Sequence, residues 1–422
     1  MNSNIAKKKK IALVLSGGGS LGSYEVGAIK VLEEHGYSFD IVTGTSIGAL
    51  NGAFCVSGQS NELERLWSNI TPTKVMVDGF NFNAKQLTNP SSDNFNVIKK
   101  WSLQYVKDGV GADISPFKDY IRNSLDVDKC MESNIKFGIT TAKFPTFSPI
   151  DMNMNNIKDK NIFLSFLHAS SACFPVFPIE YINGIKYVDG FYNDNLPIRL
   201  AFDYGADEVF AIDMKLFDKK PQHKFYLSLP NVHYIAPYIS LGSMLDFSQE
   251  AIQKNIKLGY LDTKKYFGDY RGFCYTFKDV KPVDGFLSYI LHNYGVNSEF
   301  ILNELSNNVN KKMDELDYFI RSIESIAIRL DIQAYYEAYT IDEFVEIIKK
   351  RIQELNDEDL LKSLFEKGKE LFASSIETNS TKTKIAFLLN FSVDYLGLSD
   401  INGKPLLSSS LLSLNNSKKK SN

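Results

Sequence analysis

The amino-acid sequence predicts an α/β protein with a parallel sheet flanked by helices, followed by an additional α-helical C-terminal region. Short, continuous apolar segments alternate with glycine-rich turns and helical patterns over about two-thirds of the chain. From about residue 298 onward, apolar residues recur at spacings of three and four with Glu and Lys between them. That spacing is typical of amphipathic helices.

The first strand–helix–strand–helix unit is the clearest part of the pattern. Ile11–Leu15 is a short apolar run typical of a strand buried on both faces, and 22–34 has the spacing of a helix packed on a sheet. A second strand is predicted at 39–43, and a helix of small apolar residues at 49–56. This alternation indicates parallel strands joined by helices.

Further elements continue the α/β pattern to at least Tyr275. Leu63, Leu66 and Trp67 suggest a helix, whereas the polar stretch 81–96 is expected to be a loop and 151–160 to be exposed. The remaining predicted elements are strands at 135–142, 186–189 and 208–213 and helices at 114–125, 164–172 and 200–204.

The C-terminal pattern predicts two or more long amphipathic helices that pack as a bundle, the last reaching to about residue 377. Burial of their apolar faces is the simplest interpretation, and a membrane-binding or partner-binding role is the alternative. We expect a basic N-terminal extension at 1–8, an α/β domain at 9–285, a helical region at 286–400 and a disordered tail at 401–422.

The composition is that of an ordinary globular protein and excludes several classes of function. Of the 422 residues, 44% are hydrophobic and 23% charged, and the net charge of −3 gives no basic field to attract nucleic acid. The four cysteines are far apart and form no CxxC or Cys/His cluster, so we predict no zinc site and expect free thiols in a reducing compartment.

Neither a signal peptide nor a run of about 18 apolar residues is evident, so we expect a cytoplasmic protein. The basic stretches Lys7–Lys10 and 418–420 could contact anionic lipid, although solvated ends are the simpler interpretation.

A glycine-rich turn, Gly17-Gly-Gly-Ser-Leu-Gly22, lies between the first predicted strand and helix. Glycines allow backbone N–H groups to converge, and such groups at a helix N-terminus bind an anion or a developing oxyanion. The same stretch matches GxGxxG, so a dinucleotide site is an alternative. Asp40, the acidic residue at about the right distance, lies near the start of the second strand, whereas that motif requires it at the end.

A second motif, Gly44-Thr-Ser-Ile-Gly48, lies where the second strand meets the next helix. G-x-S-x-G at such a junction permits a strained turn that raises the serine hydroxyl above the sheet. The helix that starts at Ile47 adds its backbone dipoles near a reacting carbonyl. Ser46 is therefore a candidate nucleophile.

A serine hydroxyl needs a base to become nucleophilic at neutral pH. None of the five histidines has a context that favours this role; His168, for example, lies on an apolar helix and is interpreted as packed. The alternative is a carboxylate, and Asp189 in Tyr187-Val-Asp-Gly190 ends a short strand. Asp-Gly alone is more often a simple turn.

Together these segments resemble the patatin-like phospholipase family, in a bacterial-type form with an extra helical C-terminal region. The glycine turn, the G-x-S-x-G motif and Asp189-Gly190 occur in the family's order. The segments Ala169–Pro175, Asn195–Pro197 and Ala206–Asp213 resemble neighbouring blocks of the family. The resemblance covers residues 9 to about 280.

The resemblance implies a three-layer fold and hydrolysis of acyl esters in phospholipids, lysophospholipids or related lipids, with no cofactor and no metal. The expected partners are such a lipid and a transiently contacted membrane surface, which makes the protein peripheral to the membrane. The implied site consists of the nucleophile Ser46, the base Asp189, the oxyanion-hole donors Gly17, Gly18 and Gly19, and the elbow glycines Gly44 and Gly48.

The sequence departs from the family pattern at two positions. Leu21 stands where the family commonly has Arg or Lys, which removes a cation from the site, and Phe191 stands where the family has a second glycine after the Asp. Two other functions remain open: a non-catalytic lipid-binding or scaffold protein that keeps the fold, and a nucleotide-dependent oxidoreductase.

Overall fold

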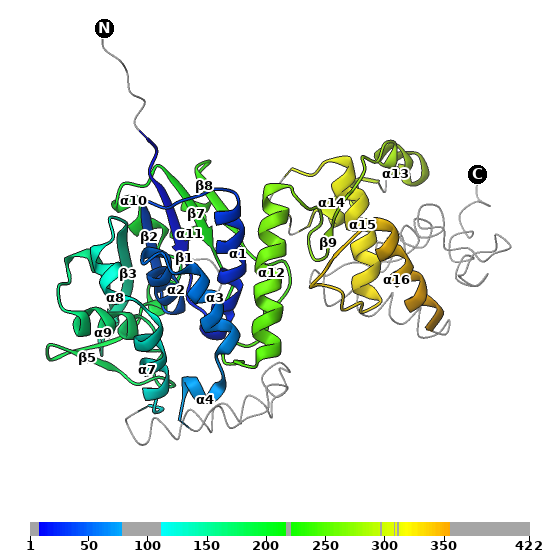
Figure 1. Ribbon diagram of the computed structural model, residues 1–422. Coiled ribbons are helices and arrows are strands. Elements are labelled where there is room, and N and C mark those ends of the chain that lie inside the picture. Colours follow the sequence, from blue (N-terminus) through cyan, green and yellow to red (C-terminus); the bar gives the residue numbers. More distant parts are fainter. Residues whose placement is uncertain are drawn as a thin grey trace, which may run out of the picture. The chain divides into compact units, whose positions relative to one another are not determined.

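A computed structural model of the chain describes residues 8–77, 111–216, 221–295, 298–307, 309 and 312–354 (Figure 1). The chain divides into two compact units, of which the first ends at Tyr266 and the second begins at Phe267. The predicted loop at 81–96, the predicted helical region beyond 354 and the predicted tail 401–422 lie outside the described residues.

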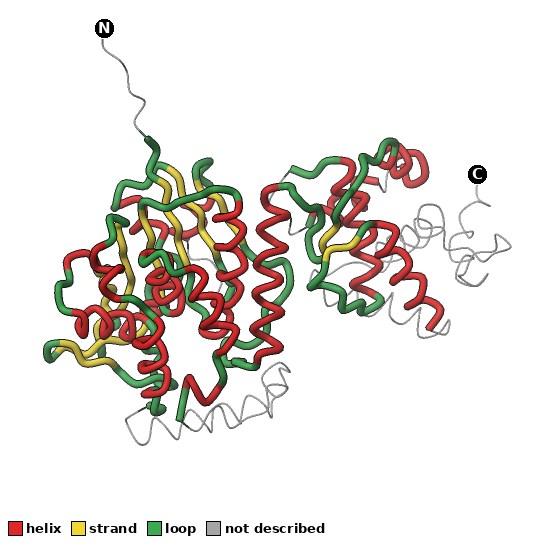
Figure 2. The backbone as a smooth tube through the Cα atoms, viewed as in Figure 1, coloured by secondary structure: helices red, strands yellow, loops and turns green. Residues whose placement is uncertain are grey.

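The first unit is built on a mixed sheet whose strands lie between helices (Figure 2). Its parallel strands, in spatial order, are β8 (Val232–Ile235), β7 (Glu208–Ile212), β1 (Ile11–Leu15), β2 (Ile41–Thr45) and β3 (Lys136–Lys143). The antiparallel strands are β4 (Ser148–Asn153), β6 (Ile185–Asp189) and β5 (Glu180–Ile182).

The prediction of a parallel sheet therefore holds for the centre and needs correction at one side. There short turns join β3 to β4 and β5 to β6, and such turns permit only antiparallel pairing. Asn183 and Gly184 between β5 and β6 both have positive φ, as a two-residue hairpin turn requires.

Helices cover both faces of the sheet, which gives the predicted three layers. On one face α2 (Ile47–Val56) lies over β1, β2 and β3, and α9 (Lys160–Ser170) over β3 and β6. On the other face α10 (Ile198–Asp203) and α11 (Pro221–Leu227) lie against β1, β2, β7 and β8. The remaining helices of this unit are α1 (Ser23–Glu34), α3 (Ser60–Asn69), α4 (Pro72–Val75), α7 (Ser115–Ser124), α8 (Val127–Glu132) and α12 (Gln249–Phe267).

Most predicted elements of this unit are confirmed, with ends shifted by a few residues. The second strand begins at Ile41 rather than at 39, and the segment predicted to be exposed at 151–160 contains part of β4. Strands β4, β5 and β8 and helices α4, α8, α11 and α12 were not predicted. The sheet's last strand in sequence is β8, so the α/β pattern ends well before Tyr275.

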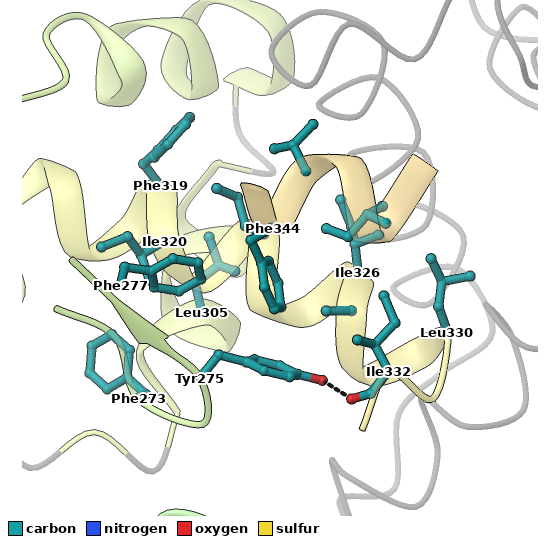
Figure 3. Close-up of a cluster of buried hydrophobic side chains, with 14 of the residues drawn as sticks. Phe273, Tyr275, Phe277, Leu305, Phe319, Ile320, Ile326, Leu330, Ile332 and Phe344 are labelled. Carbon is teal, nitrogen blue, oxygen red and sulfur yellow. Dashed lines mark hydrogen bonds between the residues drawn. The ribbon is translucent and has the colours of Figure 1, made fainter. Parts of the chain in front are cut away.

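The second unit is helical, as predicted, and includes a short two-stranded sheet. Its helices are α13 (Phe286–Tyr294), α14 (Ser298–Ser306), α15 (Glu315–Arg329) and α16 (Ile341–Glu354), and its strands are β9 (Thr276–Phe277) and β10 (Ala338–Tyr339). Figure 3 shows aromatic side chains such as Tyr275 and Phe344 packed against isoleucines of α15, with the Tyr275 hydroxyl donating to the Ile332 carbonyl at 2.8 Å.

A buried carboxylate ties the start of this unit to α15. Glu324 is fully buried and accepts the N–H groups of Phe273 and Tyr275 at 2.7 and 3.0 Å, and its other oxygen accepts from Arg321. Residues 273–277 thus belong to the core of the second unit, whereas the sequence suggested a boundary near 285. The domain limits given from the sequence, 9–285 and 286–400, therefore remain predictions.

Helices α1 and α12 pack with their backbones in direct contact. A Cβ atom on Gly27 would overlap the Ile256 carbonyl oxygen, and one on Gly259 would overlap that of Tyr24. Glycine is the only residue that allows this approach, although it is a poor helix former.

We expect the substitution Gly259→Ala to destabilise the protein by about 1–3 kcal/mol, because the added methyl group has to push the two helices apart. Intrinsic helix propensity alone would give the opposite sign, a gain of about 1 kcal/mol. Urea unfolding measures the difference. Gly52→Ala in α2 is the matched control, because its Cβ would meet side-chain atoms rather than backbone, of which the nearest belongs to Val42, at 3.0 Å. Equal stability of both variants would contradict the close contact.

Candidate active site

Ser46 lies in a tight turn between the carboxyl end of β2 and the start of α2. Its backbone has φ 56° and ψ −126°, a conformation that non-glycine residues rarely adopt. A Cβ on Gly44 would lie 2.5 Å from the Gly48 carbonyl oxygen, and one on Gly48 would lie 2.5 Å from that of Ser16. Both flanking glycines are therefore required by the backbone of this turn.

The hydroxyl of Ser46 points at a carboxylate. Its Oγ donates a hydrogen bond to Asp189 Oδ2 at 2.7 Å. Asp189 ends β6 and lies opposite Thr141 of β3, whose neighbour Thr140 lies opposite Thr45 of β2. The sheet thus brings together two residues that are far apart in the sequence.

The carboxylate of Asp189 is almost completely shielded from water. Asp189 is 1% exposed and Ser46 8%. Burial raises the pKa of Asp189 to about 7, and the hydrogen bonds from the Phe191 N–H and the Ser46 hydroxyl oppose that rise. No described cation forms a salt bridge with Asp189, so its oxygens stay available to the serine.

The predicted glycine turn lies directly beside Ser46. A Cβ on Gly17 would lie 3.0 Å from the Ser46 Cβ. The Gly17 N–H donates to the Asn195 carbonyl at 3.2 Å, whereas the N–H groups of Gly18 and Gly19 have no acceptor among the described residues. Of the three predicted oxyanion donors, the N–H group of Gly17 is therefore already used in a hydrogen bond within the protein.

Asn195 holds this turn and was not predicted as a site residue. In addition to the carbonyl contact, its side-chain amide donates to the Gly17 carbonyl at 3.1 Å. The next residues reinforce the arrangement, because Thr43 Oγ1 on β2 donates to the Pro197 carbonyl at 3.0 Å. The sequence did contain a signal for this residue, because the segment Asn195–Pro197 resembles a block of the family. That resemblance did not assign a role to Asn195.

A cavity of about 110 Å³ opens beside Ser46 and Gly19. Its other walls are mainly apolar and come from separate parts of the first unit, including Phe117 of α7, Phe177 after α9 and the segment 244–247 before α12. Neither the cavity nor its outer segment could be located from the sequence, because these residues carry no motif.

The two departures from the family pattern leave this geometry intact. Leu21 is apolar and buried, so the side chain at this position supplies no charge to the cavity. Phe191 has no positive φ, and its N–H donates to Asp189 Oδ1 at 2.9 Å. A glycine is therefore unnecessary at position 191.

None of the histidines in the described part of the chain hydrogen-bonds to Ser46. His168 is packed as interpreted, and burial lowers its pKa to about 3. His223 Nε2 lies 2.7 Å from Asp194 Oδ1, and His233 contacts Glu208 and Tyr266. Over the same residues no cluster of three or more His, Cys, Asp and Glu could hold a metal ion. No described helix is both long and apolar enough to cross a bilayer.

Comparisons with known proteins agree with the resemblance seen in the sequence. Residues 13–202 match the family model described as patatin-like phospholipase. The chain is 25% identical over 237 residues to the lysophospholipase NTE1 of Phaeosphaeria nodorum, covering 52% of this chain and 13% of that protein. It is 26% identical over 216 residues to the NTE1 lysophospholipase of Candida albicans, covering 51% and 14%. The matched part is thus a small fraction of these relatives.

Among solved structures, VipD from Legionella pneumophila is similar at 13% identity with a TM-score of 0.41, covering 93% of this chain and 92% of that one. The sequence match contains the glycine turn, Ser46 and Asp189. Residues 13–202 of this chain are thus similar to the patatin-like phospholipase family.

Proposed function

We propose that this protein is a lipid acyl hydrolase of the phospholipase A or lysophospholipase type that uses a Ser46–Asp189 dyad. The observation that carries the proposal is the 2.7 Å hydrogen bond from the Ser46 hydroxyl to Asp189, in a strained turn beside the glycine-rich turn. A nucleophile and a base within hydrogen-bond reach, with amide donors beside them, are what acyl transfer needs.

In the first half of the reaction Ser46 Oγ attacks the ester carbonyl while Asp189 accepts its proton. The oxyanion that forms is stabilised by backbone N–H groups of the glycine turn, and we narrow the donors to Gly18 and Gly19 because Gly17 is occupied. Asp189 then returns the proton to the departing alcohol, which leaves an acyl-enzyme.

In the second half a water molecule attacks the acyl-enzyme. Asp189 accepts a proton from this water and passes it to Ser46 Oγ as the acid leaves. A base with a pKa of about 7 suits both steps, because it is ionised near neutral pH yet basic enough to take a proton. The dyad needs no histidine, metal or cofactor.

The proposed substrate is a phospholipid, a lysophospholipid or a related acyl-ester lipid. The family match and the lysophospholipase names of the relatives support this class. Since such lipids form membranes, we expect the protein to contact a membrane surface transiently and peripherally. We also expect it to be cytoplasmic.

We expect Ser46→Ala to abolish labelling by a fluorophosphonate probe and to lower ester hydrolysis by at least about 10³-fold, because the nucleophile is lost. Ser171→Ala is the matched control: Ser171 also lines the cavity, but its hydroxyl bonds to backbone carbonyls of its own helix. A folded wild-type protein that neither reacts with the probe nor cleaves a panel of phospholipids would instead support a non-catalytic lipid-binding protein.

We expect kcat/KM to rise with pH and to level off above about pH 7, because only ionised Asp189 can accept the serine proton. Below that pH the rate should fall about tenfold per pH unit. Rates on a water-soluble ester between pH 5 and 9 test this. A profile that is flat from pH 5 upward is the contrary result, since it would require a base already ionised at pH 5.

We expect Asp189→Asn to stabilise the fold at pH 8 while removing activity. The pKa of Asp189 is raised in the native state, so its ionisation costs stability. That cost is absent below pH 4, grows as pH rises and is complete above about pH 7. The gain at pH 8 should reach at most about 4 kcal/mol.

Urea unfolding at pH 4 and pH 8 measures this difference. Asp128→Asn is the control, because that carboxylate is exposed and paired with Lys160. A gain that is equal at both pH values, or absent at pH 8, would argue against a strained buried carboxylate at position 189.

A further inference from the structure

The segment between β8 and α12 is irregular and lies beyond the family match, which ends at residue 202. Three of its side chains, Met244, Leu245 and Phe247, line the cavity that contains Ser46. Phe247 is 4% exposed, so its ring is part of the packed wall rather than a mobile surface group. This face of the cavity is thus built by residues that carry none of the dyad chemistry.

The same segment is bonded to the glycine turn. The Met244 carbonyl accepts the Ser20 N–H at 2.9 Å, and the Ser243 carbonyl accepts the Ser20 hydroxyl at 3.0 Å. A Cβ on Gly19 would overlap the Met244 carbonyl oxygen, so the two backbones are in contact. The position of the Gly19 N–H therefore depends on where residues 243–244 lie.

An apolar wall beside a nucleophile fits an apolar portion of the substrate. Besides Ser46, the polar side chains of the lining come from Ser171 and Cys173, and the described residues that line the cavity include no charged one. A charged or strongly polar head group would lose its hydration on entering such a site and gain no hydrogen bonds in return. A hydrocarbon chain has no such hydration to lose, so its burial is favourable.

We propose that this cavity binds the acyl chain of the substrate, and that residues 243–247 set its chain-length preference and position the Gly19 N–H. The inference rests on the proposed hydrolase function. A chain that fills the cavity presses on the side chain of Met244, whose carbonyl accepts the Ser20 N–H of the glycine turn. Chain length should therefore change kcat and not only KM, because the oxyanion donors act in the transition state.

Water-soluble p-nitrophenyl esters with acyl chains of two to eight carbons test the binding part. Phe247→Ala removes a ring from the wall and should raise the ratio of kcat/KM for the longest ester over the shortest by about tenfold. Leu241→Ala is the matched control, because Leu241 is buried in the same segment but does not line the cavity. It should lower stability without changing the ratio. An unchanged ratio in Phe247→Ala overturns the acyl site.

Ser20→Ala tests the positioning part. It removes one of the two hydrogen bonds to residues 243–244 and should lower kcat by about threefold to tenfold on every ester while KM stays the same. A change confined to KM, or no change, overturns the positioning role. Failure of the proposed function is distinguishable, because then wild type itself would neither cleave the esters nor react with the fluorophosphonate probe at Ser46.

Discussion

The whole site depends on strand register at the carboxyl edge of the sheet. Thr45 pairs with Thr140, and Thr141 pairs with Asp189, while β4 occupies the other edge of β3, so the serine that follows β2 and the carboxylate that ends β6 meet on the same edge of β3. Because side chains alternate along a strand, a slip of one residue would turn Asp189 to the opposite face. The hairpin with Asn183 and Gly184, whose positive φ angles fix a two-residue turn, sets the register of β6 against β5 on its other side.

The burial of Asp189 at this position explains both why the carboxylate is basic enough to accept a proton and why its ionisation lowers the stability of the fold. Asp189 receives hydrogen bonds from Ser46 and from the Phe191 backbone, but no cation in the described part of the chain compensates its charge. An ion pair would have held its pKa low and made it a poor base. The protein thus keeps a buried charge poorly compensated where proton transfer would need it, and the surrounding core has to supply the missing stability.

Much of this could be predicted from the sequence, because glycines and short apolar runs carry strong local constraints. The turn at Gly17, the elbow at Ser46 and the Asp189-Gly190 strand end were each recognisable, and the structure brings them together. The antiparallel side of the sheet was not predicted, since β5 is short and β4 lies in a polar, Asn-rich stretch. The occupied Gly17 N–H and the wall at 243–247 depend on contacts between distant segments, which local patterns do not encode.

The glycine contact between α1 and α12 has an effect beyond stability. Helix α12 begins at Gln249, directly after the segment that contains Phe247, and α1 begins directly after the glycine turn. Since Gly27 and Gly259 set the spacing of these helices, they also bear on how closely the glycine turn and residues 243–247 pack together. A substitution at either glycine is therefore expected to change the shape of the cavity wall as well as the stability of the helix pair.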